Sequence, residues 1–208
     1  VGAQLEGFDT MVHLTKENDF IVLEGDEYLS SPMDRRPKFH LYQPNIALIS
    51  GIAWDHINVF PTYENYVEQF EIFIKMITNG GILVYNEEDS EVKRVAEAAT
   101  NPIRKLPYST PKYAVKDGVT LLETPEGAMP IEVFGAHNLN NLAGAKWICQ
   151  NMGGDEADFY EAIASFKGAS KRLEKIAESK TKVAYKDFAH SPSKVAATTK
   201  AVKEQYPN

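Results

Sequence analysis

The stretch from Ile46 to Tyr85 decides the fold, because two short apolar runs, Ile46-Ala-Leu-Ile49 and Ile82-Leu-Val-Tyr85, enclose an amphipathic segment. Short, uninterrupted apolar runs that end at polar or glycine residues are typical of strands covered on both faces. Between them, residues 63–77 carry aromatic and aliphatic side chains at helical spacing. This strand–helix–strand order predicts an α/β fold with a mostly parallel sheet flanked by helices.

The residues around this unit extend the prediction. Phe20-Ile-Val-Leu23 is a further apolar run and predicts a first strand, and residues 87–99 predict a surface helix. From 106 to 134 the pattern changes to short β-prone pieces, broken by the hairpin signals Asp117-Gly118 and Glu126-Gly127. We therefore expect a small antiparallel β appendage over about 106–134. Its strands are expected at 112–115, 119–123 and 131–134.

The last third of the chain predicts helices at 138–152 and 156–166, followed by a polar, basic stretch at 167–182 that is typical of a hinge. A strand is expected at 183–188 and a final helix from Ser191-Pro192-Ser193. One strand and one helix cannot bury a core of their own. We therefore expect a central domain over 1–174, and a linker with the start of a truncated second domain over 175–208.

Composition limits the class of partner. A net charge of −7 argues against a nucleic-acid-binding surface. The apolar runs are far too short to span a bilayer, and no charged-then-apolar leader opens these residues. A single cysteine, Cys149, excludes an internal disulfide and fits a reducing compartment. These features favour a cytoplasmic protein that binds no membrane and no nucleic acid.

Polar residues occupy equivalent places after the first two expected strands. Glu24-Gly25-Asp26-Glu27 comes after the first strand and Trp54-Asp55-His56 after the second. Ligands of such sheets bind just beyond the carboxyl ends of the strands, so carboxylates here can reach a Mg²⁺ ion. The alternative is ordinary surface chemistry, with a solvated acidic turn in the first case and a capping pair in the second.

Three polar residues, His137, Asn138 and Asn141, stand where a helix is expected to begin. Asn138 and Asn141 are three residues apart and share one helix face. Side-chain amides offer a donor and an acceptor, which suits the edge of a purine base. Taken alone, the pattern is more often helix capping than recognition.

The end of the last expected strand repeats the pattern with Asp187 and His190. Lys171-Arg172 precedes it, and arginine is a natural clamp for a transferring phosphate, although a basic pair is usually just solvated. Together these clusters indicate a metal and nucleotide site on an α/β fold. They do not specify the reaction.

The same residues resemble the Mur ligases, ATP-dependent enzymes of peptidoglycan synthesis. Residues 20–44 are especially similar to the branch that reattaches the recycled tripeptide, because Asp34-Arg-Arg-Pro-Lys-Phe39 replaces the usual run of the alanine-adding branch. Further matches, in the family's order and spacing, are Trp54-Asp-His-Ile-Asn-Val-Phe60, Gly135-Ala-His-Asn-Leu-Asn-Asn141, Lys171-Arg-Leu-Glu174 and Asp187-Phe-Ala-His-Ser-Pro192. The resemblance implies a three-layer, P-loop-like fold.

It also implies a mechanism in which ATP phosphorylates the carboxylate of UDP-N-acetylmuramic acid, and the amine of L-alanyl-γ-D-glutamyl-meso-diaminopimelate, or of L-alanine, attacks the acyl phosphate. The matched positions then acquire roles. Glu24 and His56 would hold Mg²⁺, and Arg172 would reach phosphates when the domains close. The remaining matched residues would line the ATP site or the nucleotide and incoming-peptide side: His137, Asn138 and Asn141 for the first, Asp187 and His190 for the second.

Departures from the family pattern qualify this expectation. No Gly-x-x-Gly-Lys-Thr phosphate loop occurs in these residues, Gly51 stands where relatives commonly have Asn, and Ser191 replaces a second His. Phe70 occupies the position of the lysine that some members carbamylate, as expected for the alanine and tripeptide branches. We therefore expect a ligase fragment that is inactive alone. The alternatives are a non-catalytic nucleotide-binding or interaction module and, more distantly, a folate-type ligase.

Overall fold

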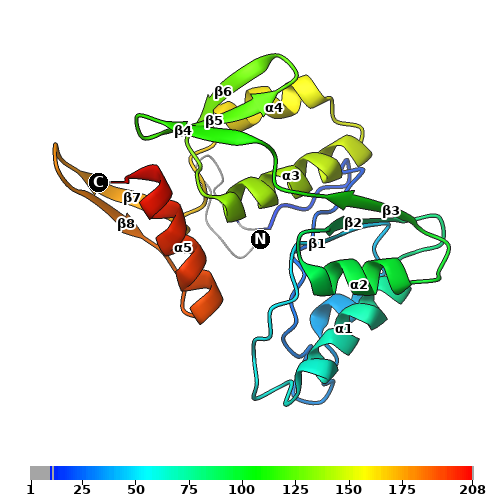
Figure 1. The fold of residues 1–208 in the computed structure, drawn as a ribbon. Helices are drawn as coiled ribbons and strands as arrows, with labels where there is room; N and C mark the ends of the chain where they lie inside the picture. Colours follow the sequence, from blue (N-terminus) through cyan, green and yellow to red (C-terminus); the bar gives the residue numbers. More distant parts are fainter. Residues whose placement is uncertain (1–9, 11, 208) are drawn as a thin grey trace. The chain divides into compact units, whose positions relative to one another are not determined.

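The computed structural model describes residues 10 and 12–207 and divides into two compact units. One unit, here called the parallel unit, comprises Gly25–Thr110 and Asn140–Asp155. The other, here called the appendage unit, comprises the residues before Gly25, Pro111–Leu139 and the residues from Glu156 onward. Figure 1 labels the elements of both units.

The parallel unit contains a three-stranded parallel sheet in the order β1-β2-β3, formed by Ile46–Ile49, Ile82–Asn86 and Arg104–Tyr108. The two apolar runs form neighbouring strands, with Ile46 opposite Ile82. The helix between them is α1 (Tyr63–Lys75), and α2 (Ser90–Ala98) follows β2. The predicted strand–helix–strand core is confirmed.

Helices cover both faces of this sheet, so the predicted three-layer arrangement is confirmed. The largest core cluster joins β1 and β2 to α1 and α2, and includes Ile74, Leu83 and Val92, each 0% exposed. Figure 1 shows α1 and α2 together on one side of the sheet. A second cluster on the opposite face packs Val84 and Tyr108 against Ala143, Trp147 and Ile148 of α3 (Ala136–Asn151).

Both helices of the first layer begin at side-chain caps. The side-chain oxygen of Thr62 accepts a hydrogen bond from the N–H of Asn65 at the start of α1. Asp89 caps α2 by accepting from the N–H groups of Glu91 and Val92, each at 3.0 Å. Such caps satisfy N–H groups that have no partner within the helix.

The start of the predicted appendage was wrong, because β3 belongs to the parallel sheet. Arg104 pairs with Ile82 and Leu106 with Val84, and both partners lie in β2. Two of the five residues of β3 are exposed and two are half-buried. It therefore lacks the continuous apolar run that marks β1 and β2.

The appendage unit opens with an antiparallel sheet in the order β4-β5-β6, formed by Tyr113–Lys116, Val119–Thr124 and Gly127–Ile131. The first hairpin turns at Asp117-Gly118, where both residues have positive φ, as predicted. The third strand ends at Ile131, where the sequence predicted it to begin. β6 is mostly exposed and contains Gly127 and Pro130, so apolar patterning does not reveal it.

After α3, one predicted helix is confirmed and one unexpected strand replaces the predicted hinge. α4 (Glu156–Ala164) forms as expected, next to β6. The stretch predicted as a hinge instead contains β7 (Glu174–Glu178), which pairs antiparallel with β8 (Val183–Lys186). β7 is exposed over most of its length, which explains its polar sequence. The predicted last strand and helix are confirmed as β8 and α5 (Pro192–Gln205).

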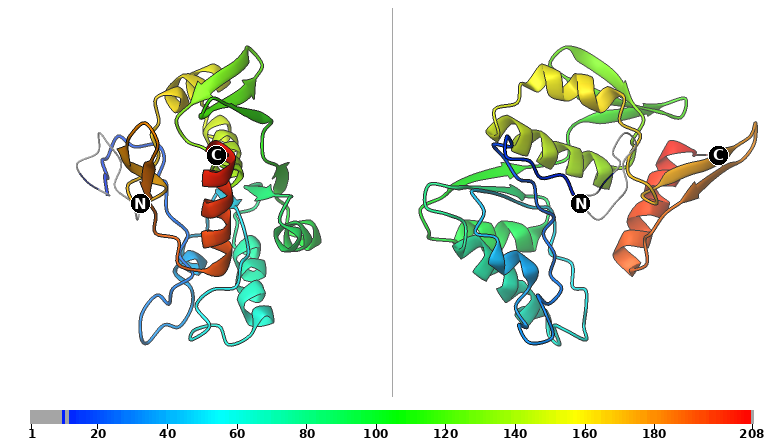
Figure 2. Two further views of the ribbon diagram at one scale, coloured as in Figure 1. Left: turned by 60° about the vertical axis from the view of Figure 1, so that its left-hand side comes forward. Right: turned by 180° about the vertical axis from the view of Figure 1, so that it is seen from behind.

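The hairpin β7–β8 lies beside α5, as the right-hand view of Figure 2 shows. A small apolar cluster of Phe134, Leu173 and Ala201 is buried there, with Tyr185 of β8 and Val202 of α5 packed against it. This cluster packs residues from both sides of the predicted boundary at 174/175 against one another within the appendage unit. The boundary itself stays a prediction.

The expected first strand, Phe20–Leu23, is wrong. These residues form no strand, and their exposed fractions run from 50% to 67%. A doubly covered strand needs hydrogen-bonded neighbours at its edges, and no described strand pairs with this run. A short 3₁₀ helix, η1 (Lys38–Leu41), precedes β1. Across the residues that the structure describes, no helix has the length and apolarity needed to cross a membrane.

Candidate nucleotide and metal site

His56 is held in an unusual conformation by the residues around it. Its φ is +54°, a backbone conformation that residues other than glycine rarely adopt. Its Nε2 lies 3.1 Å from Oε1 of Glu27, and its ring lies 4.2 Å from the ring of Tyr28. Its backbone N–H donates to the carboxylate of Asp55 at 2.8 Å. Because backbone strain of this kind clusters at functional sites, the geometry supports a role for this imidazole.

Glu27 is the carboxylate that the structure places beside His56, and sequence reasoning had chosen Glu24. Glu24 is exposed and belongs to the appendage unit, so its pairing with His56 stays a prediction. The spacing itself was ambiguous, because Glu24 and Glu27 both follow the same apolar run. A signal that favours Glu27 is the adjacent aromatic, Tyr28, which packs on the imidazole.

Mg²⁺ is the ion that these residues would hold. Among residues 10 and 12–207, no three His, Cys, Asp or Glu side chains gather closely enough to form a complete metal site. Mg²⁺ typically takes one or two protein carboxylates and completes its shell with water and substrate phosphates. The carboxylate of Glu27 beside His56 fits this partial donor set.

His137 and Asn138 stand at the start of α3, where the sequence placed them. The side-chain N–H of Asn138 donates to the carbonyl of Phe134 at 2.9 Å, which ties the start of α3 to the preceding turn but is not the acceptor role of a helix cap. His137 is half-buried, and this burial lowers the pKa of its imidazole, while the charge of Asp187 opposes the shift. The structure therefore brings His137 within electrostatic reach of Asp187.

The carboxylate of Asp187 is engaged on both oxygens. Oδ1 accepts from the backbone N–H groups of Phe188 at 2.8 Å and Leu173 at 3.3 Å, and Oδ2 accepts from the hydroxyl of Thr198 at 2.5 Å. Desolvation raises the pKa of Asp187, but these hydrogen bonds and the charge of Arg172 together leave it below its ordinary value. Asp187 thus ties the end of β8 to α5 and to the turn that carries Arg172.

Arg172 sits between two residues in the left-handed conformation, Lys171 at φ +60° and Leu173 at φ +51°. Residues other than glycine in this region cost of order 1–3 kcal/mol each. The strain is held in place because Leu173 is buried and its N–H donates to Asp187, while the N–H of Lys171 donates to Glu174. Arg172 itself is exposed, which suits a side chain that meets a ligand.

His190 lies beyond the end of β8 and is exposed. Its Nδ1 is 2.9 Å from the carbonyl oxygen of Phe188, and its ring stands edge-on to the Phe188 ring at 5.3 Å. The structure therefore brings Arg172, Asp187 and His190 to one end of the β7–β8 hairpin, while Asn141 belongs to the parallel unit.

Asn141 is exposed on α3, whereas its neighbour Asn140 is 7% exposed and makes the contacts. The side-chain N–H₂ of Asn140 lies 3.2 Å from three oxygens, which belong to Asn86, Glu88 and Thr110. Sequence reasoning missed Asn140. Its spacing of four residues from Gly144 and seven from Trp147, both on the sheet-facing side of α3, is the signal that could have found it.

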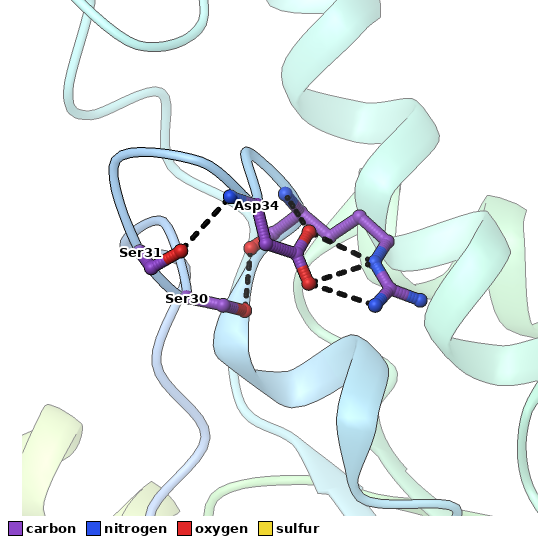
Figure 3. A network of polar contacts seen from close by, with 4 residues as sticks. Ser30, Ser31 and Asp34 are labelled. Carbon is purple, nitrogen blue, oxygen red and sulfur yellow. Dashed lines mark hydrogen bonds and ion pairs between the residues drawn. The ribbon is translucent and has the colours of Figure 1, made fainter.

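The Asp34 to Phe39 pattern begins in a loop, whose polar contacts Figure 3 shows, and ends in η1. Arg36 pairs with the carboxylate of Asp34, with a shortest N–O distance of 2.7 Å. The hydroxyl of Ser31 accepts from the N–H of Asp34, and that of Ser30 donates to the carbonyl of Arg36. The hydrogen bonds from Arg36 lower the pKa of Asp34 to about 2. The loop tip exposes Met33, at 97%, and Arg35.

A family comparison decides the identity. The model of the Mur ligase middle domain matches residues 4–149. The chain belongs to the Mur ligase family. This member of the family is 28% identical over 216 residues to the UDP-N-acetylmuramate–L-alanyl-γ-D-glutamyl-meso-2,6-diaminoheptanedioate ligase of Escherichia coli, covering 98% of this chain and 46% of the relative. It is 27% identical to the UDP-N-acetylmuramate–L-alanine ligase of Porphyromonas gingivalis, covering 99% and 46%.

A solved structure of the family has the same fold as this chain. A murein peptide ligase of Psychrobacter arcticus aligns with a TM-score of 0.58 and 21% identity, covering 87% of this chain and 39% of that one. The chain spans about half the length of the curated relatives that it matches, 46% for the first two.

Proposed function

We propose that this Mur ligase chain is the nucleotide-binding part of an ATP-dependent ligase that joins UDP-N-acetylmuramic acid to L-alanyl-γ-D-glutamyl-meso-diaminopimelate. The observation that carries the proposal is the family match over residues 4–149. The 28% identity to the Escherichia coli tripeptide ligase, over 98% of this chain, supports the reaction. L-Alanine is the alternative acceptor, since an alanine ligase is 27% identical. A longer, cytoplasmic protein would supply the phosphate loop that these residues lack.

The residues near His56 would serve the phosphoryl transfer. His56, with Glu24 or the adjacent Glu27, would hold Mg²⁺, which when bound neutralises charge on the transferring phosphoryl group. Tyr28 and Asp55 keep the imidazole and backbone of His56 in place by stacking and by a hydrogen bond.

The residues on α3 and at the β7–β8 hairpin would bind the rest of ATP. Asn141 is exposed and would offer its amide to the adenine edge, with His137 and Asn138 lining the same site. Arg172 would bind phosphate oxygens from its strained turn. Asp187 and His190 would face the nucleotide and the incoming peptide.

The choice of tripeptide over alanine rests on the loop of Figure 3. A resemblance to the tripeptide-adding branch singled out Asp34 to Phe39, and these residues form a loop fixed by the Asp34–Arg36 ion pair. The Arg35 side chain at its tip is exposed. A tripeptide that ends in several carboxylates suits such a cation better than free alanine does.

The test is phosphate release from ATP in the presence of UDP-N-acetylmuramic acid and one acceptor, either the tripeptide or L-alanine. It is run on the 208-residue chain and on the longer protein of which we propose it is a part. Release by the longer protein with tripeptide alone supports the proposal, and release with alanine alone assigns the biosynthetic reaction. Silence with both acceptors, while Mg-ATP still binds, would favour the non-catalytic module.

A matched pair of histidine variants tests the assignment of His56. His56→Ala should lower phosphate release by about 100-fold or more, because it removes a residue proposed to act on the transferring phosphoryl group. His13→Ala is the control, since His13 is exposed and lies outside the candidate site. Equal activity of the two variants would remove His56 from the mechanism.

A further inference from the structure

Asn140 is joined to the ends of the strands in the parallel unit. Its amide hydrogens are shared among Oδ1 of Asn86, which ends β2, Oε2 of Glu88, just beyond β2, and Oγ1 of Thr110, just beyond β3. The carboxyl edge of a parallel sheet is where such folds bind ligands. Asn140 therefore fastens α3 to the edge that is placed for binding.

The acceptors of Asn140 are themselves held by further hydrogen bonds. The hydroxyl of Thr110 donates to Oε2 of Glu88 at 2.6 Å. Asn86 accepts from the N–H of Glu88 at 3.1 Å and donates to the carbonyl of Ser50, just beyond β1, at 3.0 Å. Each member is fixed by at least one other, so the network specifies one position for the amide of Asn140.

A second contact fixes the same helix face one turn further along. A Cβ added at Gly144 would lie 3.0–3.1 Å from the Tyr108 ring and hydroxyl and from Leu48. α3 therefore approaches β1 and β3 as closely as its glycine allows. With Asn140 held by polar contacts and Gly144 by packing, α3 cannot rotate about its axis without breaking both.

We propose that Asn140 is a positioning residue of the nucleotide site: by tying α3 to the carboxyl edge of the sheet, it holds the neighbouring Asn141 toward adenine. This inference rests on the proposed function, because Asn141 is the residue proposed to meet the base. Asn140 is buried and faces the sheet, so it acts through the helix and does not touch the nucleotide.

The test is a double-mutant cycle on Mg-ATP affinity, measured by calorimetry on the 208-residue chain. Asn140→Ala should weaken ATP binding by about tenfold, because losing one hydrogen bond between Asn141 and the base changes the affinity by roughly that factor. In an Asn141→Ala background, the same change should have almost no further effect, because coupled residues are non-additive. GTP binding, which does not use the adenine edge, should change by less than about twofold.

Two further variants separate positioning from general stability. Asn151→Ala is the matched control, because Asn151 lies on the same helix and its side-chain amide donates to the carbonyl of Trp147, away from the strand ends. It should leave ATP affinity unchanged. Thr110→Val removes one acceptor of Asn140 and the donor to Glu88 without touching α3. It should weaken ATP binding in the same direction as Asn140→Ala, by a smaller factor.

Hydrogen exchange gives a readout that is independent of the nucleotide. In Asn140→Ala the amides from Asn141 to Gly144 should exchange faster, while those of β2 stay protected. Unchanged exchange there would overturn the inference even if ATP binding falls. If Asn140→Ala lowers ATP affinity equally with Asn141 present and with Asn141→Ala, the positioning role of Asn140 is overturned and the proposed function is not. Failure of the unsubstituted chain to bind Mg-ATP would overturn this role of Asn140 in the 208-residue chain, whereas the proposed function is overturned only by the phosphate-release test on the longer protein.

Discussion

The contacts that hold the sheet of the parallel unit differ in kind from those that hold α5 in the appendage unit. The parallel unit buries large apolar side chains completely, with Ile74, Leu83 and Val84 each 0% exposed. Within the appendage unit, the apolar cluster beside α5 is small and specific polar pairs between α5 and the β4-β5-β6 sheet supplement it: Thr120 with Gln205 at 3.1 Å, and Tyr113 with Glu204 at 2.8 Å. Apolar burial is non-directional, whereas a hydrogen bond fixes a geometry. The comparison teaches that α5 is held on the β4-β5-β6 sheet by contacts that select one arrangement.

Leu83→Ala should have the largest effect. Leu83 lies in the middle strand at 0% exposure, so the substitution leaves a cavity and should cost about 2–5 kcal/mol in the free energy of unfolding. Urea unfolding followed by circular dichroism measures it, with Leu41→Ala, 49% exposed, as the control. A loss under about 1 kcal/mol would contradict the picture of a tightly packed parallel unit.

Thr120→Val probes the other unit. Thr120 is 0% exposed and its hydroxyl donates to the side-chain oxygen of Gln205, so the variant leaves that oxygen unpaired and should cost about 1–3 kcal/mol. Unfolding in urea reports the loss, and Thr181→Val, on an exposed residue, is the control. A Thr120→Val, Gln205→Leu double variant should recover part of the stability. No recovery would mean that packing, and not the hydrogen bond, dominates.

Thr198→Val tests the contacts of Asp187 through the pH dependence of stability. The folded-state pKa of Asp187 lies below its ordinary value, so its contribution is present above that ordinary value and lost as pH falls through the folded pKa. Removing the Thr198 hydrogen bond should cost about 1–2 kcal/mol at pH 7 and flatten the acid limb. Thermal unfolding from pH 7 to pH 2 measures both. Parallel profiles for the two proteins would refute the assignment.

Tyr113→Phe should have the smallest effect. The hydroxyl donates to the exposed carboxylate of Glu204, and such surface contacts contribute under about 1 kcal/mol. Desolvation, with the Glu204 contact second, raises the pKa of Tyr113 to about 12. Its contribution is therefore present below its ordinary pKa and lost as pH rises through about 12. Absorbance titration should lose one late-ionising phenol in the variant. Retention of that phenol would reassign the raised pKa.

How much the sequence predicted follows from how each element is buried. Ile46–Ile49 and Ile82–Tyr85 were predicted because strands covered on both faces need apolar residues at every position. β3 and β7 were missed because exposed positions interrupt β3 and make up most of β7, so neither shows a continuous apolar run. Phe20–Leu23 shows the converse, since an apolar run forms a strand only where neighbouring strands supply hydrogen-bond partners.

The residues of the candidate site also differ in whether the sequence alone reveals them. His56 was singled out because its position after a strand is visible in the sequence, and the structure adds its strained backbone and its partner Glu27. Asn140 was missed because its partners, Asn86 and Thr110, are 54 and 30 residues away. Contacts over such separations depend on topology and not on local pattern. The roles of His137, Asn138, Asn141, Arg172, Asp187 and His190 stay predictions.

Gly135 has a consequence for how this sequence can vary. Its φ is +86°, and a Cβ added there would fall on the Cβ of Ala201 in α5 and crowd the ring of His137. Two separate constraints, conformation and space, therefore exclude a side chain at one position. Shortening the neighbour, as in Ala201→Gly, would relieve the second constraint but not the first. Substitutions at positions 135 and 201 are therefore coupled. In natural variants of this chain the glycine should persist, and residue 201 should stay small.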